Sequence, residues 1–322
     1  MSNPRPQHLP AIFGLLLANL FWGLSFPVMK ALIFAHQRLV PGSGTWFITA
    51  MTVAPRFLLA AAVLLLVARR HLVRITLLEQ WQGLLLGLTV AGGLLFQTDG
   101  LQFTSASVSA FLTQFYALMI PLVIAVRTRR APSAVVWLSS VLVLGGVGIL
   151  ARFDPRAMHL GRGELETLLS SVFFMAQIFV LGDKRYGANR VLPVTFVMFS
   201  TQAGVFCVMA LMSAPQPAAV LVPWSSTMWL GCTVLLAVFC TLGAFTLMNR
   251  WQPEITTTEA GLIYCFEPVF ASVMALFLPG MFSRWGGFSY ANERVTWQLL
   301  AGGGLITLAN ILLQLKPPAK PA

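Results

Sequence analysis

The feature that most constrains this sequence is a series of apolar runs, each about as long as the twenty-residue helix that crosses a bilayer. We place ten such runs at residues 11–33, 47–68, 82–101, 106–126, 134–151, 165–183, 191–213, 226–249, 258–279 and 297–315. Hydrophobic residues make up 57% of the chain and charged residues only 10%, a composition typical of polytopic membrane proteins. The predicted fold class is an all-α membrane protein with ten transmembrane helices.

The basic residues predict how these helices are oriented in the bilayer. A net charge of +11 would suggest a nucleic-acid partner for a soluble protein, but here Lys and Arg stand in short segments between the apolar runs. We therefore expect the lipid bilayer as a partner and no nucleic acid. The segments on the side of the two termini contain most of these bases: Arg5, Arg69, Arg70, Arg74, Arg127, Arg129, Arg130, Lys184, Arg185, Arg190, Arg250, Lys316 and Lys320. Since Lys and Arg are concentrated on the cytoplasmic side of membrane proteins, both termini are predicted to be cytoplasmic.

Two similar sequence patterns, each found once in either half of the chain, divide the predicted helices into two sets of five. The fifth and tenth runs each have a tryptophan followed by clustered glycines, and the fourth and ninth each have a Ser/Thr-rich start and a proline, Pro121 or Pro268. Because five is an odd number, two such halves have opposite orientations in the bilayer, which is the inverted-repeat plan of many secondary transporters. We predict a first five-helix repeat over residues 1–155 and an inverted second repeat over 156–322.

The ninth run carries one carboxylate, Glu267, near its middle, and Pro268 follows it directly. An ionised side chain at this depth is costly, so it normally faces a polar cavity or a partner. Proline removes a backbone donor and clashes with the carbonyl four residues earlier, so we expect a helix kink here, and another at Pro121. Glu267 is interpreted either as a proton carrier or substrate anchor, or as an architectural tie between a kinked helix and its neighbour.

A second charge lies inside a run, since Arg56 stands about ten residues into the second one. It is a candidate to hold a substrate carboxylate, or it has the structural role, favoured here, of pairing with Glu267 or with helix-end carbonyls. Asp99 and Lys30 stand near the ends of their runs, where we expect solvated side chains. Thr256-x-x-Glu259 is the pattern of a capping box at a helix start.

Uncharged polar and aromatic side chains inside the runs are the candidates for substrate recognition. Buried amides and hydroxyls need hydrogen-bond partners, so most are expected to contact neighbouring helices and a few to face a central cavity. With few buried charges, such a cavity suits a small neutral, zwitterionic or amphipathic solute. The candidate residues are Trp22, Gln97, Gln114, Tyr116, Gln177 and Tyr264.

Four short stretches carry a resemblance to a known family. They are Phe21-Trp22-Gly23 with Lys30, Arg56-Phe57, TSASVSAFLTQFYALMIPL from Thr104 to Leu122, and Glu267-Pro268-Val269. In order and spacing the chain resembles the EamA-type permeases of the drug/metabolite transporter superfamily. The resemblance implies ten helices in two repeats, a bacterial inner-membrane location, and a secondary transporter, often an exporter of amino acids or other small metabolites. The chain departs from this family in lacking the Gly-Glu pair at the ends of the fourth and ninth helices, and in its longer outer loops, 34–46 and 279–295.

Other chemistries find less support in the sequence. The four cysteines all lie in apolar runs and no phosphate-binding loop is present, so we expect no metal, no cofactor and no ATP-driven pump. His8, His36, His71 and His159 lie in loops or at run ends, and the HExxH and GxSxG motifs are absent. A membrane-embedded enzyme acting on a lipid or a small amphipathic substrate is the alternative to a transporter, and protons are the candidate coupling ion.

Overall fold

The computed structural model describes residues 8–104, 109, 112–150 and 161–315, and within these ranges it contains helices and no strands. Six helical units are long and apolar enough to cross a membrane: α1 (His8–Leu39), α2 (Thr45–Leu72), α3 (Leu77–Phe103), α7 (Arg162–Gly182), α8 (Val191–Ser213) and the unit Thr227–Glu254. A bent pair of helices, Thr257–Met274 and Leu278–Gly286, forms a seventh candidate span. The chain is therefore a multi-pass membrane protein.

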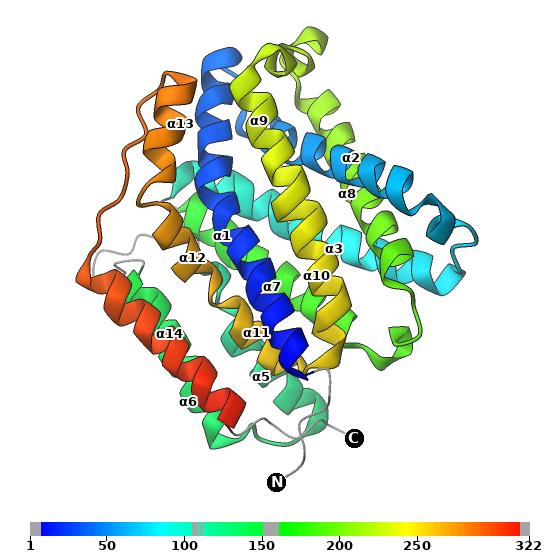
Figure 1. Ribbon diagram of the computed structural model, residues 1–322, viewed down its shortest axis with the longest axis vertical. Coiled ribbons are helices and arrows are strands. Elements are labelled where there is room, and N and C mark those ends of the chain that lie inside the picture. Colours follow the sequence, from blue (N-terminus) through cyan, green and yellow to red (C-terminus); the bar gives the residue numbers. More distant parts are fainter. Residues whose placement is uncertain (1–7, 105–108, 110–111, 151–160, 316–322) are drawn as a thin grey trace.

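The shorter elements complete the bundle in Figure 1. The other predicted runs hold α5 (Tyr116–Thr128), α6 (Ala134–Leu150) and α14 (Trp297–Leu315), so ten crossing helices remain a prediction, and the run 106–126 begins outside the described residues. Short connecting turns are η1 (Lys184–Tyr186), η2 (Pro217–Val220), η3 (Val222–Ser225) and η5 (Gln252–Glu254). The start of α1 and the end of α14 lie at the same end of the molecule (Figure 1). We call this the terminal end.

Capping residues fix where two of the helices begin. At α11 (Thr257–Tyr264), Thr256 Oγ1 accepts a hydrogen bond from the Glu259 backbone, and the Glu259 carboxylate accepts one from the Thr256 backbone at 2.8 Å. Thr76 and Glu79 make the same pair of bonds at the start of α3. The predicted capping box at Thr256 is confirmed, and it satisfies backbone donors that a helix start leaves unpaired.

Two of the long runs are irregular within the bundle. The ninth run divides into α11, α12 (Glu267–Met274) and α13 (Leu278–Gly286), and its α-helical bonding is interrupted at Cys265 and Phe266. The eighth run divides into α9 (Thr227–Leu235), a π-helical segment η4 (Leu236–Gly243) and α10 (Ala244–Trp251). π-helical turns are rare and are frequent at functional sites.

Close helix packing organises the bundle around four main pairs. The most extensive contacts join α2 with α8, α3 with α7, α6 with α14, and α3 with α8. Glycines allow the last of these, because a Cβ added to Gly83 would lie 2.6 Å from Val197 Cβ and one added to Gly87 would lie 2.5 Å from Thr201 Cβ. Small residues serve the same purpose in many membrane helix pairs.

Candidate functional site

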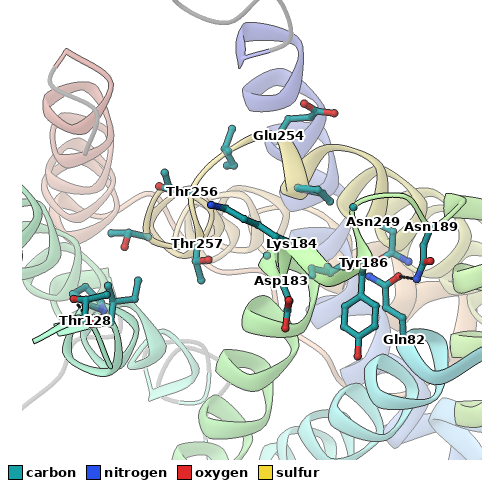
Figure 2. Close-up of a pocket in the computed structure, with 18 of the residues that line it drawn as sticks. Gln82, Thr128, Asp183, Lys184, Tyr186, Asn189, Asn249, Glu254, Thr256 and Thr257 are labelled. Carbon is teal, nitrogen blue, oxygen red and sulfur yellow. Dashed lines mark hydrogen bonds between the residues drawn. The ribbon is translucent and has the colours of Figure 1, made fainter. Parts of the chain in front are cut away.

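A cavity of about 990 Å³ opens at the terminal end of the molecule. Its walls come from the ends of α5, α7 and α10, the starts of α3, α6, α8 and α11, and the loops between them. Figure 2 shows the polar side chains that line it, with Lys184 extending towards Thr256 and Thr257. Because both charge signs and several hydroxyls are present, the cavity can admit a polar solute from the aqueous phase.

The lining contains two buried amides in different hydrogen-bonding states. Gln82 Oε1 accepts a hydrogen bond from Asn189 at 2.8 Å, a contact drawn in Figure 2. Asn249 donates to Thr195 at 2.9 Å, but its carbonyl oxygen Oδ1 has no partner among the described residues. A buried unpaired acceptor is costly, and this one belongs to a residue of the cavity wall.

The rim of the cavity carries an exposed ion pair. Arg185 donates through Nη2 to Asp183 at 2.6 Å and through its backbone to the same carboxylate. The Arg185 hydrogen bonds hold the pKa of Asp183 below its ordinary value. Asp183 is therefore ionised at every pH at which an unperturbed aspartate is ionised.

The opposite end of the bundle is held together by contacts between distant segments. Arg38 of α1 donates to the carbonyl oxygens of Gly286 and Gly287 at 2.9 and 2.8 Å. Arg162 of α7 pairs with Asp99 of α3, and Lys30 donates to Leu101 O at 3.0 Å. The expectation of a solvated Asp99 is wrong, because that carboxylate is buried against Arg162 and the hydroxyl of Thr49.

An aromatic cluster lies between the cavity and the middle of the protein. The ring of Trp22 lies 5.3 Å from Phe245 and 5.6 Å from Tyr264, both in edge-on contact. Phe57 and Phe199 extend the cluster from α2 and α8. Phe245 stands four residues before the cavity residue Asn249, about 6 Å further inward at 1.5 Å per residue. The cluster therefore lies further into the protein than Asn249, and none of its rings lines the cavity.

Arg56 lies in α2 beside this cluster and is buried, with 3% of its surface exposed. Its guanidinium donates to Met29 Sδ at 3.6 Å and lies 5.0 Å from the Phe57 ring centre, while Nε has no partner. The pairing with Glu267 or with helix-end carbonyls that the sequence suggested is not found among the described residues. The structural role that the sequence favoured for Arg56 therefore has no ion-pair or carbonyl partner among the described residues.

Glu267 begins α12 directly after the interruption at Cys265 and Phe266. The residue is half-buried and makes no hydrogen bond or ion pair with any described residue. Tyr116 and Cys240, from two other spans, lie within electrostatic reach of its carboxylate. Glu267 thus lies between the fourth, eighth and ninth predicted helices without a partner among the residues that the structure describes.

The remaining sequence candidates contact neighbouring side chains. Tyr264 donates to Gln252 at 2.8 Å, and Tyr116 donates to Gln114 at 2.7 Å. Gln97 donates to Thr113 at 3.3 Å and Gln177 donates to Met248 Sδ at 3.2 Å. Pro121 lines the cavity at the terminal end, and Pro268 follows Glu267 in the first turn of α12.

Sequence reasoning missed most of the cavity lining. Gln82, Asn249 and the loop from Asp183 to Arg190 were not candidates, although they form much of its wall. The basic residues of this loop were interpreted only as signals of orientation. The available signal was the polar composition of three short segments on the same predicted side, at 128–133, 182–190 and 249–258.

Comparisons with known proteins agree with this architecture. An uncharacterized transporter of Archaeoglobus fulgidus is 24% identical over 319 residues, which cover 96% of this chain and 87% of that protein. A protein crystal structure superposes with a TM-score of 0.65 at 16% identity, covering 96% of this chain and 98% of that one, which shows a shared fold. No protein-family model matches the chain, so the resemblance to EamA-type permeases remains a prediction.

Proposed function

We propose that this protein is a secondary transporter that moves a small solute by alternating access to a central site between two inverted five-helix repeats. The observation that carries the proposal is a pair of interrupted helices at corresponding positions. The fourth predicted helix is interrupted at Gln114 and Phe115, and the ninth at Cys265 and Phe266. Transporters built from inverted repeats place their substrate sites at such discontinuous helices.

The helix contacts support the repeat. Exchanging the two proposed halves, 1–155 and 156–322, turns α2 into α8, α6 into α14 and α5 into α11, and each of these pairs is in contact. The same exchange turns the α3 contact with α7 into the contact of the α9–α10 unit with α1, which also occurs. This correspondence is what a twofold relation between the halves requires.

The access path follows from the cavity and from the opposite end. The cavity opens on the terminal end, which is rich in Lys and Arg and which we assign to the cytoplasm of a bacterial inner membrane. Contacts such as Arg38 with Gly286 and Arg162 with Asp99 join the other end. We assign the structure to a state open to the cytoplasm, from which an exporter of the EamA type loads its solute.

The proposed solute is small and neutral or zwitterionic, such as an amino acid. The unpaired groups at the helix interruptions favour this choice, since Glu267 supplies a single carboxylate and Gln114 an unpaired amide nitrogen. Glu267 is the proposed site of proton coupling, because no described residue pairs with its carboxylate. Facilitated diffusion would use the same site without coupling.

The test is counterflow in liposomes that contain the purified protein. A labelled panel of amino acids and small metabolites is exchanged with and without a pH gradient, for the parent and for Glu267→Gln. We expect a solute to exchange unchanged in mass, and Glu267→Gln to lose only the dependence on the gradient. If the variant behaves like the parent, Glu267 has an architectural role. If a chemically altered solute is recovered, the membrane enzyme is favoured.

A further inference from the structure

Buried charges in the described part of the chain are paired, with one exception. Four charged side chains are buried there: Arg56, Glu79, Asp99 and Glu259. Three of them have partners, which are Arg190 for Glu79, Arg162 for Asp99 and His8 for Glu259. Arg56 has no carboxylate within ion-pair distance among the described residues. Of these four side chains, Arg56 is therefore the one whose charge is not neutralised by an ion pair.

The hydrogen-bonding capacity of Arg56 is also largely unused. A guanidinium has five N–H donors in a planar fork, and the one hydrogen bond of Arg56 goes to the Met29 sulfur, a weak acceptor, at 3.6 Å. Nε has no partner, and the Phe57 ring supplies only a cation–π contact. An ionised arginine inside the membrane is costly and usually marks a substrate path or a paired charge. Since no described residue supplies a paired charge for Arg56, its position indicates a substrate path.

The surroundings of Arg56 fit a small anion. Arg56 lies within electrostatic reach of Cys240 in the π-helical segment, and α2 packs against this segment. The next residue, Thr241, is buried and its hydroxyl has no partner among the described residues. Cys240 also lies within electrostatic reach of Glu267. Arg56 thus lies beside an irregular helical segment that carries a buried hydroxyl and comes within electrostatic reach of a carboxylate.

Resting on the proposed function, we infer that Arg56 binds the carboxylate of the transported solute. Guanidinium and carboxylate match in a bidentate geometry that an ammonium group cannot reproduce. Among the small neutral and zwitterionic solutes of the proposed function, this subsite selects zwitterions that carry a carboxylate, such as amino acids.

The inference is tested by comparing each transported acid with its own amide in the counterflow assay. Charge-assisted hydrogen bonds are strong enough to change affinity roughly 10- to 100-fold, so we expect the parent to favour the acid by about this factor. Arg56→Lys keeps the charge but loses the fork, and Arg56→Met loses both. We expect the preference to fall in Arg56→Lys and to vanish in Arg56→Met, while Arg70→Gln, an exposed arginine of the same helix, leaves it unchanged.

A binding measurement separates lost recognition from lost folding. The transported acid is expected to raise the melting temperature of the detergent-solubilised parent and of Arg70→Gln, and to leave that of Arg56→Met unchanged. If Arg56→Met is still protected by the acid, or if acid and amide exchange equally in the parent, the inference is wrong while the transporter stands. If no solute of the panel exchanges in the parent, the proposed function fails and the inference falls with it.

Discussion

The contact between α3 and α8 gives a prediction whose size follows from the structure. A Cβ at Gly83 would lie 2.6 Å from Val197 Cβ and 2.8 Å from the Val194 carbonyl oxygen. Ordinary contacts are about 3.5–4 Å, and a backbone oxygen inside a helix cannot move aside alone, so Gly83→Ala has to separate the two helices. Such overpacking costs about 1–3 kcal/mol, against a gain of about 1 kcal/mol in helix propensity. We expect a net loss of about 0–2 kcal/mol in the free energy of unfolding.

Gly204→Ala in α8 is the matched control for this prediction. Nothing lies within 4 Å of a Cβ added at Gly204, so only the propensity gain applies and the variant is expected to be as stable as the parent or more stable. Both variants are unfolded in mixed micelles titrated with SDS, and their free energies of unfolding are compared. The reasoning about close packing is refuted if Gly83→Ala is stabilised as much as Gly204→Ala.

Two further predictions concern side-chain hydrogen bonds. Tyr264→Phe removes the 2.8 Å hydrogen bond that the side-chain oxygen Oε1 of Gln252 accepts. The free energy of unfolding should therefore fall by about 1 kcal/mol in the same SDS titration. An unchanged value would contradict this prediction. Arg185→Ala removes the donor that lowers the pKa of Asp183, so the carboxyl resonance of Asp183 should titrate at a higher pH than in the parent. In the parent, the stability from this lowered pKa is present above the ordinary aspartate pKa and is lost as the pH falls through the lowered value.

Part of this architecture can be predicted from the sequence because it depends on local chemistry. Apolar runs of bilayer length locate the helices, and the Thr256-x-x-Glu259 pattern places the start of α11. A proline next to a carboxylate favours an irregular helix, and the chain is interrupted directly before Glu267 and Pro268. Each of these signals lies within a few residues of the feature that it locates.

Properties that depend on distant segments could not be predicted in the same way. Asp99 is buried because Arg162, 63 residues away, reaches it from another helix. Arg56 has no ion-pair partner because every acid in the described chain lies too far from it. No local sequence pattern contains this information. The cavity arises where three polar connecting segments meet, and the sequence does not state that they converge.

Alternating access is best examined with one added cysteine in the cavity wall, Thr257→Cys, because this position is half-buried and lines the cavity. Three of the four native cysteines are buried and Cys207 is partly exposed, so the parent supplies the background labelling. A membrane-impermeant thiol reagent is applied to right-side-out and to inside-out vesicles of known orientation. We predict labelling from the cytoplasmic side alone, and slower labelling when a transported solute is present. Equal labelling from both sides would contradict a resting state that is open to the cytoplasm, and labelling that a transported solute does not slow would contradict a solute path through this cavity.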